Sequence, residues 1–479
     1  MKRFLTILLT TLALAGLLCV TASAANFDGP AEELAAIGML KGGAGGFDLD
    51  KAPTRAQAAI MLVRLFGAEE EAQAAYAAGD LRCPFADVND TAAPSVAWLV
   101  DKGLANGASG TSFGASDPCT GKAYTIFLLR ALGYKDGEDF TSANAQEFAM
   151  TVGLLDTSVF TGTFLRDDLV ALTYQALGAD LKDGGTYLLA SLIKSGAVDA
   201  AAAKPITEKI EAYRALQASG AAAAQGLDTS VEAKVGMNMN LKSSDGSLDM
   251  EEKADAEVKG RIQMVLDQDL QMAMDMTVTV SDGETAESEK MEYWLKDGVA
   301  YVRSGEDAYQ MPMDMGMDVE TICAMMEQAT GKTYATMLPF IDSITTKTSG
   351  GDTLYTLKLN DAFAGMINGL TGQILGLLEA GADLDMEMSF SLDGSTITYT
   401  VGKDGALKSA VADLTLKAGV KASDGKDSLT ASVSADLDMT MEVKAMGKDM
   451  KISFPDFSDF EDVIGGADGP TGIFATAIY

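Results

Sequence analysis

A change in the spacing of apolar residues at Thr229 restricts the fold of this chain more than any other feature. Beyond it, apolar side chains recur at every second position, which is typical of antiparallel strands with one apolar and one solvated face. Asp-Gly pairs such as Asp297-Gly298 have the composition of hairpin turns. The alternating runs include 231–241, 272–280, 384–392 and 437–443. They predict an antiparallel β domain over residues 225–460.

Two apolar stretches interrupt the alternation, at residues 319–337 and 362–379, and we expect both to form helices across the inner face of the sheet. A long sheet curved around helices resembles the half-barrel of LolA-like and LppX-like lipoprotein carriers. The resemblance implies a carrier or binding module for lipid or another apolar molecule. The predicted β domain over residues 225–460 holds most of the 26 methionines. Methionine suits a surface that adapts to varied apolar ligands, and it also fills ordinary cores, so both interpretations stay open.

Before residue 179 the apolar spacing is helical, and short amphipathic helices end in glycine. Three segments share the order helix, glycine-rich turn, second helix, at about 31–67, 83–133 and 140–178. A single helix pair cannot bury its apolar face, so the three units should pack as one bundle over residues 25–178. Thr54 and Thr120 stand where the N-caps of second helices belong.

The second unit contains Phe85-Ala86-Asp87-Val88 and a helix with Trp98, and the first contains Thr54-Arg55-Ala56-Gln57. These motifs resemble the S-layer homology (SLH) repeat, which implies non-covalent binding of secondary cell-wall polysaccharide. The basic residue of the last motif carries over to Arg55, and Lys122 and Arg166 are its counterparts in the other units. A cation at a helix N-terminus suits a ketal carboxylate, with Thr54 and Thr120 beside it. The alternative is that these are ordinary solvated charges.

Residues 1–24 have the composition of a signal peptide. Lys2 and Arg3 precede an apolar run, and Ala22-Ser23-Ala24 supplies a small-residue cleavage site. A membrane anchor is the alternative. In an exported protein Cys83 and Cys119, which share one repeat, are the natural disulfide pair.

The chain contains no histidine, which removes the commonest general base and metal ligand. We therefore expect no enzyme, cofactor or metal, and a carboxylate-based hydrolase is the least supported alternative. Lys plus Arg is 36 against 69 for Asp plus Glu, a formal charge of -33. Such a chain repels nucleic acid, so no nucleic-acid partner is expected.

Together these patterns predict a multidomain fold: an all-α SLH-like bundle of three repeats, then a mainly antiparallel β half-barrel with helical insertions (α+β). A helical connector over 179–224 joins them, and a Gly-rich tail follows over 461–479. The expected function is that of a secreted protein of the cell wall or S-layer surface. It attaches to wall polysaccharide and displays its β domain. The identity of the glycan, the ligand of the β domain and the role of the tail are left open.

Overall fold

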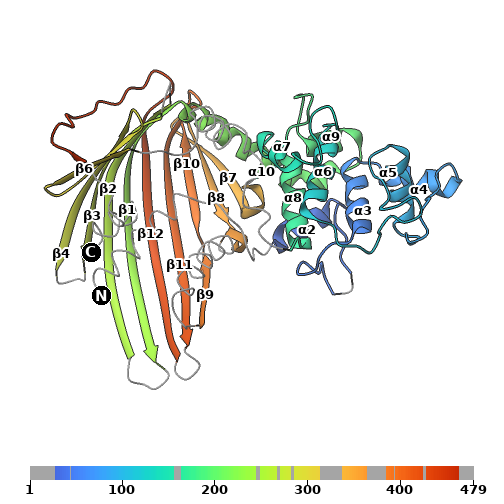
Figure 1. The fold of residues 1–479 in the computed structure, drawn as a ribbon, viewed down its shortest axis with the longest axis horizontal. Coiled ribbons are helices and arrows are strands. Elements are labelled where there is room, and N and C mark those ends of the chain that lie inside the picture. Colours follow the sequence, from blue (N-terminus) through green and yellow to red (C-terminus); the bar gives the residue numbers. More distant parts are fainter. Residues whose placement is uncertain are drawn as a thin grey trace.

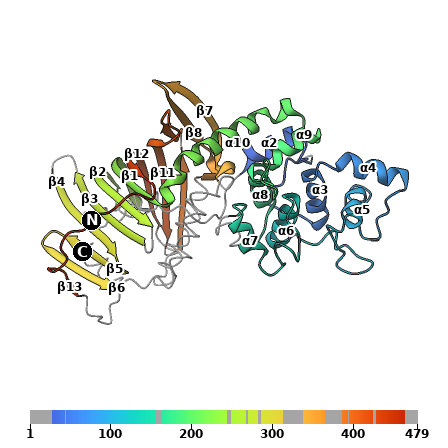
Figure 2. The ribbon, with the colours of Figure 1, turned by 90° about the horizontal axis from the view of Figure 1, so that it is seen from above.

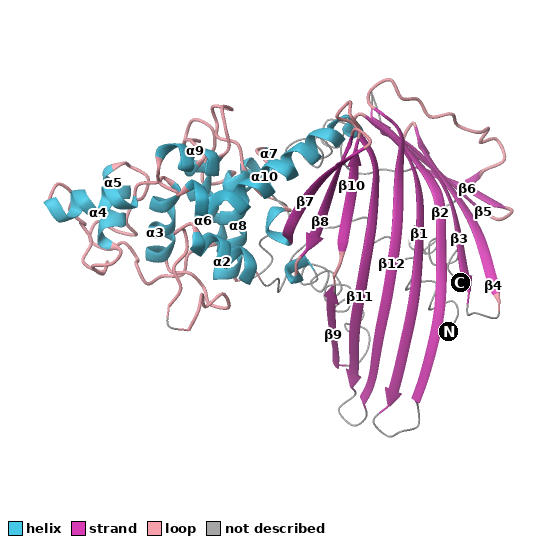
Figure 3. Cartoon of the chain, turned by 180° about the vertical axis from the view of Figure 1, so that it is seen from behind, coloured by secondary structure: helices cyan, strands magenta, loops and turns pink. Residues whose placement is uncertain are grey.

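The computed structural model describes residues 27–43, 45–155, 163–243, 249–266, 270–281, 285–312, 337–363, 385–392, 394–423 and 428–462. The described part of the molecule is elongated, with the helices gathered at one end and the strands at the other (Figure 1, Figure 3). The expected signal peptide, the end of the tail from residue 463, and most of the two expected helical insertions lie outside these ranges.

The helical end is built from short helices and one long one. None of the described helices is both long and apolar enough to cross a membrane. The helices are α2 (Asp28–Ala36), α3 (Arg55–Leu65), α4 (Glu69–Ala78), α5 (Ala93–Asp101), α6 (Gly121–Ala131), α7 (Ala145–Thr151), α8 (Arg166–Gly178), α9 (Leu188–Ser195) and α10 (Ala200–Gly220), with 3-10 turns η1 (Ala221–Ala224) and η3 (Leu338–Phe340).

Local chemistry accounts for where several of these helices begin and end. Thr54 accepts a hydrogen bond from the backbone of Gln57, whose side chain accepts one from the backbone of Thr54, so α3 begins with a capping box. Thr120 caps α6 with its hydroxyl oxygen alone, which accepts a hydrogen bond from the backbone N–H of Ala123. Helices α4 and α9 stop at Gly79 and Gly196, both at φ of 81°, a conformation that glycine adopts without a steric penalty.

The strands form one open sheet, antiparallel except where the last strand joins it, and the sheet is curved when seen from above (Figure 2). Its order is β13-β6-β5-β4-β3-β2-β1-β12-β11-β10-β8-β7, with β9 also paired to β11. The strands are β1 (Gly226–Ser243), β2 (Asp249–Leu266), β3 (Leu270–Ser281), β4 (Ala286–Lys296), β5 (Val299–Ser304), β6 (Asp307–Pro312), β7 (Ile341–Ser349), β8 (Asp352–Leu359), β9 (Asp385–Leu392), β10 (Thr396–Val401), β11 (Leu407–Ser423), β12 (Ser428–Met446) and β13 (Glu461–Asp462).

The pairing keeps apolar residues on one face of the sheet. Val235 of β1 lies opposite Leu437 of β12 and Ala256 of β2, and Ala256 lies opposite Val280 of β3. A slip of one residue would move each of these side chains to the solvated face, so the alternation fixes the register. The hairpin predicted at Asp297-Gly298 is present, with φ of 52° and 71° at its two residues.

The two ends of the molecule share a hydrophobic core. It runs from the helices through Tyr213 of α10 to Phe340 and Leu357 at the β7 edge of the sheet. Phe27, which precedes α2, meets Phe340 edge to face with ring centroids 5.3 Å apart. The connector predicted over 179–224 is therefore more than a spacer, because the long helix α10 within it is packed against both ends.

The predicted architecture was wrong in two respects: the closure of the sheet into a half-barrel, and the separation of the helical bundle from the sheet. The described strands form one open 13-stranded sheet that is not closed into a barrel. The helices do not make a separate three-repeat bundle either, because their core continues into the edge of the sheet. Alternation determines which side chains share a face. Curvature and closure depend on twist and on pairing between distant strands, which the pattern does not encode.

Candidate functional site

The first turn of α3 contacts the second helical unit through Arg55. Its Nε donates to the carbonyl oxygen of Phe113 at 3.1 Å and its Nη2 to that of Asn106 at 3.4 Å. The guanidinium carbon lies 5.0 Å from the centre of the Phe113 ring, within range of a cation–π contact. Much of the donor capacity proposed for a glycan carboxylate is thus used inside the protein.

The loop that receives Arg55 is itself held by Asp87. Its carboxylate accepts from the backbone N–H groups of Phe113, Gly114 and Ala115 at 2.8 to 3.0 Å, and from the hydroxyl of Ser112 at 3.0 Å. The backbone bonds from Ala115 and Phe113 contribute most to a pKa of Asp87 far below its usual range. The acidic residue of the Phe-Ala-Asp-Val motif therefore has a structural role.

The first residues of two helices each donate a backbone hydrogen bond to a loop of another unit. The backbone N–H of Arg55 donates to the carbonyl of Asp117 at 2.9 Å, and that of Arg166 donates to the carbonyl of Lys51 at 2.8 Å. The first unit therefore pairs with the second, and the third with the first. Residues 156–162, between α7 and α8, lie outside the described residues.

The five predicted polysaccharide-binding residues are placed differently from one another. Thr54 and Thr120 use their hydroxyl oxygens as helix caps. Lys122 is exposed and occupies the second position of α6, after Gly121 at the first. Arg166 is half-buried at the start of α8, near enough to Asp48 to lower its pKa, although Lys51 lowers it more. The three cations stand at three separate helix starts.

The two cysteines predicted to form a disulfide are free thiols in the structure. Cys83 Sγ donates to the carbonyl of Phe85 at 3.8 Å, and Cys119 Sγ donates to that of Thr120 at 3.6 Å. Burial raises the pKa of Cys119 to about 11.

The apolar face of the sheet is a second candidate binding surface. Its side chains on β2, β3 and β4 form cross-strand rows, and many are methionines. In one row Met264 lies opposite Met272, which lies opposite Leu295, and in the next Ile262, Met274 and Tyr293 follow the same order. All but Leu295 are half-buried. Such a contiguous apolar surface, left partly open, commonly marks a site of binding.

Gly260 shows how closely this face is packed around one methionine. It lies opposite Met276, and a Cβ added to it would meet the backbone oxygen of Asp275 at 2.6 Å and Cγ of Met276 at 2.8 Å. Glycine is therefore needed for Met276 to lie over β2. The sequence alternation does not reveal this requirement, because an isolated glycine in a strand has several explanations.

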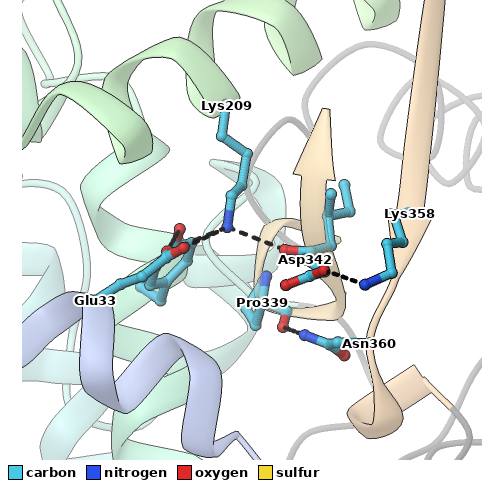
Figure 4. Close-up of polar contacts among 8 residues, drawn as sticks. Glu33, Lys209, Pro339, Asp342, Lys358 and Asn360 are labelled. Atoms are coloured by element: carbon cyan, nitrogen blue, oxygen red, sulfur yellow. Dashed lines mark hydrogen bonds and ion pairs between the residues drawn. The ribbon is translucent and has the colours of Figure 1, made fainter. Parts of the chain in front are cut away.

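Helices and sheet meet at a buried lysine (Figure 4). Lys209 of α10 is 6% exposed and donates to the carbonyl of Ile341 at 3.0 Å and to both carboxylate oxygens of Glu33. Tyr174 Oη donates to the same carboxylate, and Lys209 Nζ lies 5.2 Å from the centre of its ring. Within the described ranges, no group of three Asp, Glu or Cys side chains is placed to hold a metal ion.

Comparison with known proteins finds similarity among solved structures. No family model and no curated protein matches the chain, so the resemblance to SLH repeats has no support from a family model. Among solved structures the chain is similar to LprF from Mycobacterium bovis, at 16% identity and a TM-score of 0.23, over 52% of this chain and 97% of LprF. A likeness at this TM-score says nothing about ligand or mechanism.

Proposed function

We propose that this chain is a non-enzymatic binding protein that holds an apolar molecule, such as a lipid acyl chain, on the apolar face of its sheet. One observation carries the proposal: methionine side chains of β2, β3 and β4 lie side by side on this face and remain half-buried. A polarizable, flexible side chain adapts to ligands of different shape, and a contiguous set of them makes an adaptable surface.

The opposite face of the same strands carries charged side chains, and this contrast supports the assignment. There Lys259 lies 2.9 Å from Glu257, and Lys290 lies 3.0 Å from both Asp275 and Glu292. A face that carries these ion pairs is suited to contact with solvent. Binding of an apolar molecule is therefore expected on the methionine-bearing face alone.

The test uses the neutral fluorescent probe N-phenyl-1-naphthylamine with full-length delipidated protein. We expect fluorescence to rise on binding to wild type and the affinity to fall about tenfold or more in Met274→Lys, because a charge in an apolar site costs more than 1.4 kcal/mol. Thr279→Lys is the matched control, since it adds the same side chain to the same strand on the solvated face.

Native mass spectrometry of protein purified without delipidation gives a second readout. A bound mass removable by organic solvent supports the proposal. Absence of any bound mass, together with equal probe affinity in wild type and both variants, contradicts it.

A second candidate function is attachment to an anionic cell-wall polymer through the helical end, which would locate the chain at the cell surface. Three helix starts bear a cation, Arg55, Lys122 or Arg166, close to backbone N–H groups, and two of these starts pair with loops of other units in the same manner. Anions bind readily at such positions.

Co-sedimentation with purified cell-wall polysaccharide tests this candidate. Arg55 is unsuitable as the first target, because it also holds the loop at Phe113. The double change Lys122→Ala and Arg166→Ala should reduce the sedimented fraction, with Lys194→Ala as a control at another exposed lysine. Equal sedimentation of all three proteins would exclude this function.

A further inference from the structure

The segment over residues 451–460 lies against the solvated face of the sheet, on the side away from the methionines. It follows β12 and leads to β13, which pairs with β6 at the far edge (Figure 1). Phe457 stacks on Tyr301 with ring centroids 3.7 Å apart, and Trp294 meets Phe457 edge to face at 5.7 Å. These aromatic contacts fix the segment over β4 and β5.

An open hollow of about 670 Å³ lies beside this segment, with strands β2, β3 and β4 as its floor and Phe454 and Pro455 on one wall. The floor of the hollow is recessed at its centre because the residue there has a small side chain. Ala273 stands between its cross-strand neighbours Gln263 and Trp294, so a methyl group occupies the middle of a row that has long side chains on both sides. The volume falls within the range of small-molecule sites.

The charged groups in the hollow already have partners. Arg261 forms two hydrogen bonds with Asp228, at 2.8 and 2.6 Å, and Lys290 forms ion pairs with both Asp275 and Glu292. An ionic ligand would have to compete with these pairs. A neutral ligand can use the fixed donors and acceptors without disturbing them, because ionised groups make the stronger hydrogen bonds.

We propose that this hollow binds a neutral mono- or disaccharide. Sugar hydroxyls both donate and accept, which matches a floor that offers Arg261, Asp275 and Glu292 together. The apolar C–H face of a pyranose ring fits the wall formed by Phe454 and Pro455. This site is on the opposite face from the proposed apolar site and does not depend on it.

Saturation-transfer difference NMR with full-length protein tests the proposal, using glucose, N-acetylglucosamine, maltose and chitobiose as probes. We expect transfer to at least one of these sugars and its loss in Ala273→Leu, which fills the hollow. Ala286→Leu is the control, because it places the same side chain on the same face of β4 outside the hollow.

Two results would overturn the assignment. One is no transfer to any of the four sugars. The other is transfer that persists undiminished in Ala273→Leu while its circular dichroism matches wild type. The zwitterionic dipeptide glycyl-leucine is the competing probe, and its binding in place of a sugar would show that the hollow recognises charge.

Discussion

Lys209 donates to both carboxylate oxygens of Glu33, at 3.0 and 3.1 Å, and thereby joins the long helix α10 to the first described helix. Its ammonium group also donates a hydrogen bond to the carbonyl oxygen of Ile341 on the edge strand β7. One side chain thus contacts the helical end, the connecting helix and the sheet.

The first prediction concerns this contact. Lys209→Met keeps the length of the side chain and leaves Glu33 without its cation, so we expect stability to fall by about 3 kcal/mol. Lys204→Met, on the exposed side of the same helix, should change little. Thermal unfolding followed by circular dichroism measures both. Equal melting temperatures in the two variants would mean that the buried pair does not stabilise the junction.

The second prediction concerns pH and Asp87. Its pKa is lowered in the folded state, so its contribution to stability is complete above the unfolded pKa of about 3.9 and is lost as pH falls toward the folded value. Asp87→Asn cannot accept all four hydrogen bonds. The melting temperature of wild type should exceed that of the variant at neutral pH, and the gap should narrow below about pH 4.

Asp167 gives the opposite dependence. Burial raises its pKa to about 7, partly offset by a hydrogen bond from the backbone N–H of Phe27 at 2.9 Å. Because the folded pKa is above the unfolded one, its favourable contribution is complete below about pH 4 and is lost as pH rises through 7. Asp167→Asn should melt above wild type at pH 8 and lose this advantage in acid. A constant difference across that range would contradict the assignment.

Thiol reactivity supplies a fourth prediction. With a pKa of about 11, Cys119 has about one thiolate in a thousand at pH 8, and its side chain is buried. Cys83 is half-buried and should be alkylated first by iodoacetamide. Peptide mass mapping distinguishes the two sites. Protection of both, released only by a reductant, would instead show that they pair by disulfide in solution.

The fifth prediction addresses the segment over residues 451–460. Phe457→Ala removes the ring that stacks on Tyr301 and meets Trp294. In a Trp98→Phe background, where Trp294 is the only tryptophan, its emission should shift to longer wavelength and become easier to quench with acrylamide. Ser458→Ala, at the next and exposed position, is the control. An unchanged spectrum would show that the segment does not cover Trp294.

Local chemistry made part of this structure predictable. Strict alternation placed Val235 and Leu437 on the apolar faces of their strands, and the two lie opposite each other in the sheet. Thr54 and Thr120 were recognisable as caps because a hydroxyl before an apolar helix satisfies the first free N–H groups. The methionine-bearing face followed from the same period. Each of these features depends on residues a few positions apart.

What could not be predicted depends on residues far apart in the sequence. Arg55 meets Phe113 across 58 positions, and Lys209 meets Glu33 across 176. No local pattern signals either contact, so Arg55 looked available for a ligand and α10 looked like a spacer. The hollow beside Phe454 was missed for the same reason, since it needs Ala273 and the C-terminal segment to come together.

The position of β1 in the sheet has a consequence for how the protein is made. It is the first strand to be synthesised, yet it lies in the interior of the sheet between β2 and β12, the last of the long strands. Until β12 emerges, one complete edge of β1 has unpaired backbone groups beside an apolar face, a state prone to associate with other chains. A ribosome that stops before β12 would therefore release a chain whose sheet is divided through its middle.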